Sequence, residues 1–373
     1  MSAMLRLAHL VEREAPRAAD FAALTEVCEG AWPGDVRRLL AESPSAEARR
    51  LLASIKWPSA RISSDRRLPL AHPLDADWRF TRECAERVLD AILSAASHAG
   101  DILLIAMPSV ALAAYDRGLA HRVVIASRDG DPIDAALRAA MTGCRFVDLP
   151  DIPASTFQTV ALDPPWYDDV ALPLIETGLH AAVADGRVLI CAPDHLTSPS
   201  SAQRLSALAT TPSVLGFSAA EFVERVRYAT PFFELRCLEA VGITGISPRW
   251  RTGLLYTCTP SPSASRGRYV TRAVGDGWRE MRLGATRIWI RRLASQENAP
   301  DVGVARSISR TDPAREIASV WTSGNTYATN VGDIGPEAIK RALEEPAPQP
   351  WQRQFRAAML DEIAAMERTV DFT

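Results

Sequence analysis

The sequence contains no apolar run that approaches the roughly 18 to 20 residues that a membrane-spanning helix needs. Charged residues follow soon after the first methionine, at Glu12, Arg13 and Glu14, so we do not expect a secretory signal. The composition, 47% hydrophobic and 23% charged, is typical of globular proteins and excludes a disordered or fibrous chain. We therefore predict a cytoplasmic protein of two or three domains with no membrane partner.

Paired cysteines and lysines are also scarce. The six cysteines are scattered singly, with no Cys-x-x-Cys pair and no histidine at metal-ligand spacing, so we predict buried apolar side chains and no metal site. Only two of the 42 basic residues are lysines, Lys56 and Lys340, and the net charge is −3. A bulk attraction to nucleic acid is not indicated, although a local groove lined by arginines stays open as an alternative.

The hydrophobic pattern changes twice along the chain, which suggests three parts. Residues 1–75 show short amphipathic helical patterns followed by a segment rich in Pro, Ser and Arg, and we interpret them as a helical module and linker. Residues 76–260 alternate between strand and helix patterns after a predicted helix at Phe80 to Ala96. Residues 261–373 follow a Pro/Ser-rich joint at Pro260 to Ser265 and form a predicted α+β appendage.

The middle part predicts a doubly wound, Rossmann-like α/β sheet. Its apolar runs have strand length and no polar face, and helical segments separate them. Such runs are typical of parallel strands that helices cover on both sides. The predicted strands are Ile102 to Ile105, Val123 to Ile125, Arg145 to Val147, Thr159 to Leu162 and Val188 to Cys191. Ligands of such sheets bind beyond the carboxyl ends of the strands.

Further strands are predicted toward the end of the chain. Glu234 to Val241 and Leu254 to Cys258 could complete the sheet as an antiparallel edge pair. In the appendage, alternating runs at Trp278 to Leu283 and Thr286 to Arg291 flank Gly284-Ala285, which predicts a hairpin. Two helices are predicted after it, near Pro336 to Glu344 and Trp351 to Arg368.

The sharpest motif is Asp163-Pro164-Pro165-Trp166-Tyr167, directly after the fourth predicted strand. It resembles the Asp-Pro-Pro-aromatic signature of amino-group methyltransferases in the class I S-adenosylmethionine-dependent superfamily. The resemblance implies that the Asp163 carboxylate and the Pro164 carbonyl accept hydrogen bonds from an amine, while Trp166 and Tyr167 stack on the target base. The alternative is a proline-rich turn with only a structural role.

The same resemblance implies an S-adenosylmethionine site around the ends of the first three strands. The loop after the first strand, Ala106-Met107-Pro108-Ser109, replaces the usual glycines, so Ala106, Met107 and Ser109 are the candidate donor-binding residues there. Ser127 and Asp129 follow the second strand, where an acid would hold the ribose. Asp148 follows the third strand, where an acid would contact the adenine amine.

Three functions stay open from the sequence. The first is a methyltransferase acting on an amino nitrogen of a nucleobase, in a nucleic acid or a nucleotide. The second is aminopropyl or alkyl transfer to a polyamine, because the order of the two loops also resembles branched-chain polyamine synthases. The third is a non-catalytic, methyltransferase-like scaffold that binds partner proteins through its terminal modules.

Overall fold

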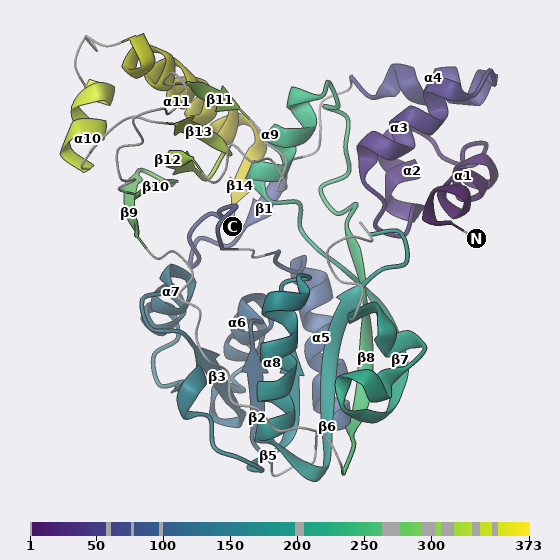
Figure 1. Ribbon diagram of the computed structural model, residues 1–373, viewed down its shortest axis with the longest axis vertical. Helices are drawn as coiled ribbons and strands as arrows, with labels where there is room; N and C mark the ends of the chain where they lie inside the picture. The colour runs from purple at the N-terminus through teal and green to yellow at the C-terminus, as the bar shows by residue number, and fades with distance from the viewer. Residues whose placement is uncertain are drawn as a thin grey trace. The chain divides into compact units, whose positions relative to one another are not determined.

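The computed structural model describes residues 2–56, 61–75, 78–96, 100–197, 205–262, 277–291, 303–306, 317–329, 336–344 and 350–373 (Figure 1). These residues form two compact units. Unit 1 comprises Met1–Ile55, Trp78–Ala229 and Arg249–Arg272, and unit 2 comprises Lys56–Asp77, Thr230–Pro248 and Ala273–Thr373. Parts of two predicted connections, residues 57–60 and 263–265, lie outside the described residues.

Unit 1 begins with four short helices, as the sequence predicts. They are α1 (Ala3–Glu14), α2 (Phe21–Val27), α3 (Pro33–Glu42) and α4 (Ala46–Ser54). Side-chain oxygens of Ser2, Asp20 and Ser45 accept hydrogen bonds from the first turns of α1, α2 and α4. Each such cap is worth about 1 kcal/mol, which matters for helices this short.

A seven-stranded sheet forms the centre of unit 1. Its order is β4 (Arg145–Asp148), β3 (Val123–Ser127), β2 (Ile102–Ile105), β5 (Phe157–Leu162), β6 (Ala182–Pro193), β8 (Thr252–Pro260) and β7 (Phe217–Arg227). The first five strands are parallel neighbours, which confirms the predicted doubly wound sheet. The chain leaves β2 toward β3 on one side and returns to β5 on the other, so the topological switch point lies between β2 and β5.

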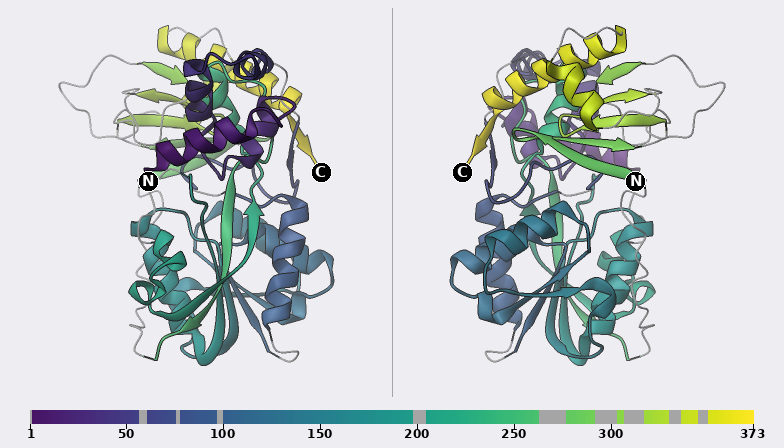
Figure 2. Two further views of the ribbon diagram at one scale, coloured as in Figure 1. Left: turned by 90° about the vertical axis from the view of Figure 1, so that its right-hand side faces the viewer. Right: turned by 90° about the vertical axis from the view of Figure 1, so that its left-hand side faces the viewer.

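Helices cover both faces of this sheet. The blue helices α5 (Arg82–Ala95) and α6 (Pro108–Asp116) lie on one side of it, and the teal helix α8 (Asp168–Ala181) lies on the other (Figure 2). Helix α7 (Pro132–Ala140) packs against α6. Short 3₁₀ segments complete the connections: η1 (Ala120–Arg122), η2 (Leu149–Asp151), η3 (Leu205–Ala209) and η4 (Pro212–Leu215). In the part of the chain that the structure describes, no helix is long and apolar enough to cross a membrane.

The predicted antiparallel pair is half wrong. Residues predicted as a strand at Glu234 to Val241 form helix α9 (Phe232–Ala240), because Phe232, Leu235 and Leu238 are buried at helical spacing. The predicted strand at Leu254 to Cys258 is confirmed within β8, which is antiparallel to both of its neighbours, β6 and β7. Strand β7 escaped prediction because most of its side chains are exposed, so it has no buried, strand-like apolar run.

Unit 2 contains a five-stranded antiparallel sheet. Its order is β11 (Val304–Arg306), β13 (Thr326–Thr329), β12 (Ala318–Thr322), β10 (Thr286–Arg291) and β9 (Trp278–Leu283). The predicted hairpin of β9 and β10 and the two predicted helices, α10 (Pro336–Glu344) and α11 (Pro350–Thr369), are confirmed. Helix α11 packs Phe355 and Met359 against the sheet. Strands β1 (Ile62–Ser64) and β14 (Val370–Phe372) form a separate parallel pair.

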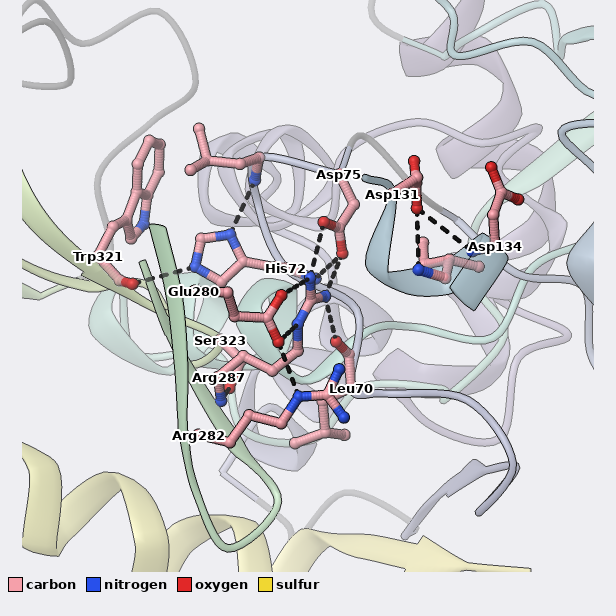
Figure 3. Close-up of polar contacts among 12 residues, drawn as sticks. Leu70, His72, Asp75, Asp131, Asp134, Glu280, Arg282, Arg287, Trp321 and Ser323 are labelled. Carbon is pink, nitrogen blue, oxygen red and sulfur yellow. Dashed lines mark hydrogen bonds and ion pairs between the residues drawn. The ribbon is translucent and has the colours of Figure 1, made fainter. Parts of the chain in front are cut away.

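Unit 2 buries an ionic cluster around Arg287, drawn in Figure 3. The guanidinium of this fully buried residue donates to the carboxylates of Asp75 and Glu280 and to the carbonyl of Leu70. Burial alone would lower the pKa of Arg287, but the Asp75 and Glu280 carboxylates outweigh it and raise that pKa. Next to this cluster, His72 bonds through Nε2 to the Trp321 carbonyl, 3.2 Å away.

The cysteine prediction holds for four of the six residues. Cys28, Cys84, Cys191 and Cys258 are buried and unpaired, whereas Cys144 and Cys237 are partly exposed, contrary to expectation. Cys144 lies in the turn before β4. The sulfur of Cys237 accepts a hydrogen bond from the Asn325 amide, which gives this thiol a polar neighbour instead of an apolar core.

Candidate functional site

The sheet brings the predicted site residues to one edge of unit 1. Because β2, β3, β4 and β5 are parallel, the residues after each strand meet at the same, carboxyl edge. The backbone N–H of Asp163 donates to the carbonyl of Ile105 at 3.2 Å, so the Asp-Pro-Pro-Trp segment lies directly beside the loop at Ala106. Ser127 and Asp148 are paired in register at the ends of β3 and β4.

Asp163 is held by a residue that the sequence analysis missed. The hydroxyl of Tyr228 donates to Asp163 Oδ1 at 2.8 Å. Tyr228 follows β7, which is parallel to β6 because both are antiparallel to β8, so its side chain reaches the same edge of the sheet. Burial, reinforced by the charge of Asp163, raises the pKa of Tyr228 well above its usual range, so the phenol remains a donor. No sequence signal pointed to Tyr228, because the strand that carries it was not predicted.

The two aromatic residues of the motif differ in their surroundings. Trp166 is 7% exposed, and its ring meets the edge of the Tyr228 ring at 5.3 Å between centroids. The guanidinium carbon of Arg251 lies 4.7 Å from the centroid of the Trp166 ring and 4.1 Å from that of Trp78. Tyr167 is partly exposed and forms the N-cap of α8. The motif therefore both ends β5 and begins α8, with Pro164 buried between them.

The loop after β2 contains no glycine, but its backbone adopts a conformation that glycine favours. Ala106 has φ +53°, in the left-handed region that glycine adopts most easily, and it is exposed. Pro108 begins α6 directly after it, and Ser109 is partly exposed in the first turn of that helix. The Met107 side chain is packed inside the protein at 3% exposure, so it contributes no accessible surface to this edge.

Polar side chains at the ends of β3 and β4 are joined by hydrogen bonds. The Ser127 hydroxyl donates to Asp148 Oδ1 at 2.9 Å, and the Arg138 guanidinium donates to both residues, at 2.6 and 3.0 Å. Arg138 also lies over the Phe146 ring, 4.5 Å from its centroid. Asp129, in the turn that follows β3, is exposed and makes no contact with this group that the structure records. Ser127 and Asp148 are thus brought together, whereas Asp129 stands apart from them.

A second carboxyl group beyond β3 is unusual. Asp131 caps α7 by accepting from the backbone of Ile133 at 2.8 Å, and Asp134 accepts from the backbone N–H of Arg128 at 2.7 Å. Burial, together with the charge of Asp131, raises the pKa of Asp134 to about 7. This acid therefore titrates near neutral pH, unlike an ordinary helix-capping aspartate.

The residues at this edge fit an adenosyl group. Ribose hydroxyls and an adenine amine are hydrogen-bond donors, and the carboxylates of Asp129 and Asp148 are acceptors at the ends of β3 and β4. Ala106 presents the smallest side chain after glycine and already holds the left-handed conformation.

Comparisons with known proteins give distant structural similarity only. No protein-family model and no curated protein matches the chain. A branched-chain polyamine synthase from Thermus thermophilus, in complex with an aminopropylspermidine and 5′-methylthioadenosine, is similar with a TM-score of 0.48 and 14% identity, over 73% of this chain and 92% of that one. A Burkholderia thailandensis didemethyltoxoflavin methyltransferase with bound S-adenosylhomocysteine has a TM-score of 0.30 and 15% identity, over 48% of this chain and 78% of that one.

A third similar structure is a Thermus thermophilus 16S ribosomal RNA methyltransferase in complex with S-adenosylmethionine and guanosine. Its TM-score is 0.29 and its identity 16%, over 66% of this chain and 55% of that one.

Proposed function

We propose that the protein is an S-adenosylmethionine-dependent transferase that methylates an amino nitrogen held at Asp163. One observation carries the proposal: the Asp163 backbone bonds to Ile105, so the motif carboxylate lies beside the Ala106 loop at the carboxyl edge of a doubly wound sheet. That edge is where sheets of this topology bind their ligands. A hydrogen-bond acceptor for an amine and a loop suited to a nucleotide-like donor thus meet at the switch point between β2 and β5.

The donor would be held by residues after three neighbouring strands. Ala106 and Ser109 would face its amino-acid portion, Asp129 its ribose and Asp148 its adenine amine. When bound, S-adenosylmethionine supplies a methyl group activated by a sulfonium. The Ser127 hydroxyl acts indirectly, since it fixes the Asp148 carboxylate and is itself held by Arg138.

Asp163 and Pro164 would orient the acceptor. The carboxylate and the proline carbonyl accept N–H bonds from the amine and so turn its lone pair toward the donor. A fixed acceptor needs no reorganisation during the transfer, which is why such contacts can lower a barrier by several kcal/mol. The partly exposed Tyr167 is the aromatic side chain of the motif with the larger accessible surface for stacking.

The surroundings of Asp163 favour an aromatic amine, such as that of a nucleobase, over a polyamine. Aromatic side chains gather around this carboxylate: Tyr228 bonds to it, and Trp166 and Phe80 pack on the Tyr228 ring. A polyamine would need several carboxylates for its ammonium groups. Three acids of unit 1 have arginine partners: Asp194 with Arg225, Glu224 with Arg87, and Glu26 with Arg227 and Arg249.

Donor binding can be measured by titration calorimetry with S-adenosylmethionine and S-adenosylhomocysteine on the purified protein. We expect both to bind, and we expect Asp148→Asn to weaken both by about tenfold, since one good hydrogen bond to a charged group contributes on the order of 1.5 kcal/mol. Glu176→Gln, on the helix that covers the sheet, is the matched control and should leave affinity unchanged. Failure of the wild-type protein to bind either compound would favour the non-catalytic scaffold.

Transfer can be followed with methyl-labelled donor and separate acceptors: nucleosides, RNA, DNA and spermidine. We expect Asp163→Ala to reduce turnover by on the order of a hundredfold while lowering the free energy of unfolding by about 1 to 3 kcal/mol, because it removes the acceptor of the buried Tyr228 hydroxyl. Asp169→Ala is the control, because this exposed residue lies in the first turn of α8, six positions along the chain. If Asp163→Ala instead melts the protein without a selective loss of turnover, the motif is a structural turn.

A further inference from the structure

Contacts to both its ring and its backbone hold Tyr228 in place. Its ring stacks on Phe80 at 4.8 Å and meets Trp166 edge-on at 5.3 Å. Its backbone N–H donates to the carbonyl of Arg251 at 3.0 Å, and it forms an isolated β-bridge with Phe80. Both the backbone and the ring are therefore held, and the phenol oxygen can lie in only one place.

The residue that Tyr228 bonds is the acid that we propose holds the amine. A buried hydroxyl needs a partner, since leaving one unpaired costs stability. Tyr228 is 1% exposed, whereas Asp163 is partly exposed at the carboxyl edge of the sheet. A buried hydroxyl thus donates to a carboxylate that reaches the surface. The hydrogen bond fixes the orientation of the Asp163 carboxylate.

Gly253 on β8 makes room for this arrangement. A Cβ at Gly253 would lie 2.9 Å from Cζ2 of Trp166, closer than real side chains come, and 3.1 Å from Cε2 of Tyr228, which is a tight contact. Strand β8 therefore passes directly against the two rings. A side chain at this position would press on both rings.

We propose that Tyr228 is a positioning residue for Asp163, which fixes one carboxylate oxygen so that an acceptor amine meets the carboxylate in a single orientation. This inference rests on the proposed function, because it assigns to Tyr228 an effect on the group that would hold the amine. Tyr228 itself does not need to touch the substrate. It acts through the 2.8 Å hydrogen bond to Asp163.

Tyr228→Phe removes one oxygen atom and keeps the aromatic packing, so it isolates the hydrogen bond. With methyl-labelled S-adenosylmethionine and the best acceptor of the panel above, we expect kcat to fall at least tenfold while KM for the donor stays within twofold. Tyr256→Phe is the matched control, since Tyr256 lies on β8 of the same sheet and packs against Phe222. If Tyr228→Phe instead lowers kcat and also raises the KM for the donor well beyond twofold, the fold is damaged and the inference is overturned.

The double variant Asp163→Asn with Tyr228→Phe tests whether the two residues act as one. If Tyr228 acts only through Asp163, the double variant should turn over no more slowly than Asp163→Asn alone. Losses that multiply would show that the tyrosine has a separate role, and the positioning assignment would fail.

A readout that needs no turnover separates this inference from the proposed function. Crystal structures of the wild-type protein and of Tyr228→Phe should show the Asp163 carboxylate rotated or spread over several orientations only in the variant. An unchanged, well-ordered carboxylate in Tyr228→Phe would overturn the positioning role, whatever the activity. Absence of transfer to every acceptor by the wild-type protein would overturn the proposed function, while the crystallographic comparison would still decide the role of Tyr228.

Discussion

At the scale of single residues, this protein buries ionisable groups in two different ways. Arg287 is buried against two carboxylates of opposite charge, so it remains ionised. Asp134 is buried beside another acid, Asp131, and its pKa rises to about 7. The surroundings of Arg287 stabilise its charged form, whereas those of Asp134 stabilise its neutral form.

Asp134 should make folding depend on pH. Its pKa is about 7 in the folded protein and about 3.9 in an unfolded chain. Because the folded state binds this proton more tightly, the contribution of Asp134 to stability is greatest below about pH 4 and is lost as the pH rises to about 7, by at most about 4 kcal/mol. We expect Asp134→Asn to flatten this part of the stability curve, measured by urea unfolding at a series of pH values. Asp129→Asn, which alters an exposed acid of the same loop, should leave it unchanged, and an equal effect of both would refute the assignment.

Arg287→Met should destabilise unit 2 strongly. The substitution leaves Asp75 and Glu280 buried without their shared cation, and breaking a buried ion pair typically costs about 3 to 5 kcal/mol. Thermal unfolding monitored by tryptophan fluorescence would report it, since Trp289 lies beside Arg287. Arg282→Met removes an exposed partner of the same Glu280 and should cost about 1 kcal/mol or less. Similar losses in the two variants would mean that the buried cluster contributes little.

At the scale of helices and strands, apolar runs in the sequence were sufficient to predict those strands that have both faces covered. Strands β2, β3, β5 and β6 follow from such runs, because helices on both sides bury them. Strand β7 could not be found in this way, since an edge strand with exposed charged side chains has no buried pattern. Helix α9 was mistaken for a strand because it has only nine residues, and a short apolar segment does not distinguish a helix from a strand.

The sequence predicted those residues of the candidate site that lie at the ends of predicted strands. Asp163 and Ser127 were found because each ends a strand with a clear apolar run, and Asp148 because it ends the short strand predicted next to them. Tyr228, Arg138 and Arg251 were not, since their contacts join segments whose proximity depends on sheet order and helix packing. Their roles, like those of the predicted residues, stay predictions until ligands are tested.

Two glycines in neighbouring elements should respond oppositely to alanine. Gly253→Ala on β8 places a Cβ 2.9 Å from the backbone oxygen of Ala192, which cannot move without breaking the sheet, and we expect a loss of about 1 to 3 kcal/mol. Gly178→Ala on α8 meets its nearest atom at 3.5 Å, an ordinary contact, and should be neutral or stabilise the helix by up to about 1 kcal/mol. Chemical denaturation of the two variants would check this pair. Equal stabilities would contradict the close approach of β8 to Trp166.

At the scale of the whole molecule, the two compact units are interleaved along the chain. Unit 2 takes residues from three separate segments, so its sheet and its ionic cluster combine parts that no local pattern connects. Arg236 on α9 bonds to Asp361 on α11 at 2.7 Å across 125 positions in the sequence. The division predicted at residues 75 and 260 stays a prediction, and the contacts within unit 2 cross both of these points.

The bond between Asp75 and Arg287 has a consequence for folding during synthesis. The two residues are 212 positions apart, so at about 5 to 20 residues per second the ribosome completes Arg287 roughly 10 to 40 seconds after Asp75. During that interval most of the seven-stranded sheet is synthesised, whereas Asp75 has no arginine to bond. Unit 2 should therefore form late, around a segment that left the ribosome before unit 1 was complete, and a ribosome stalled between the two residues should carry a protease-sensitive segment at residues 61–75.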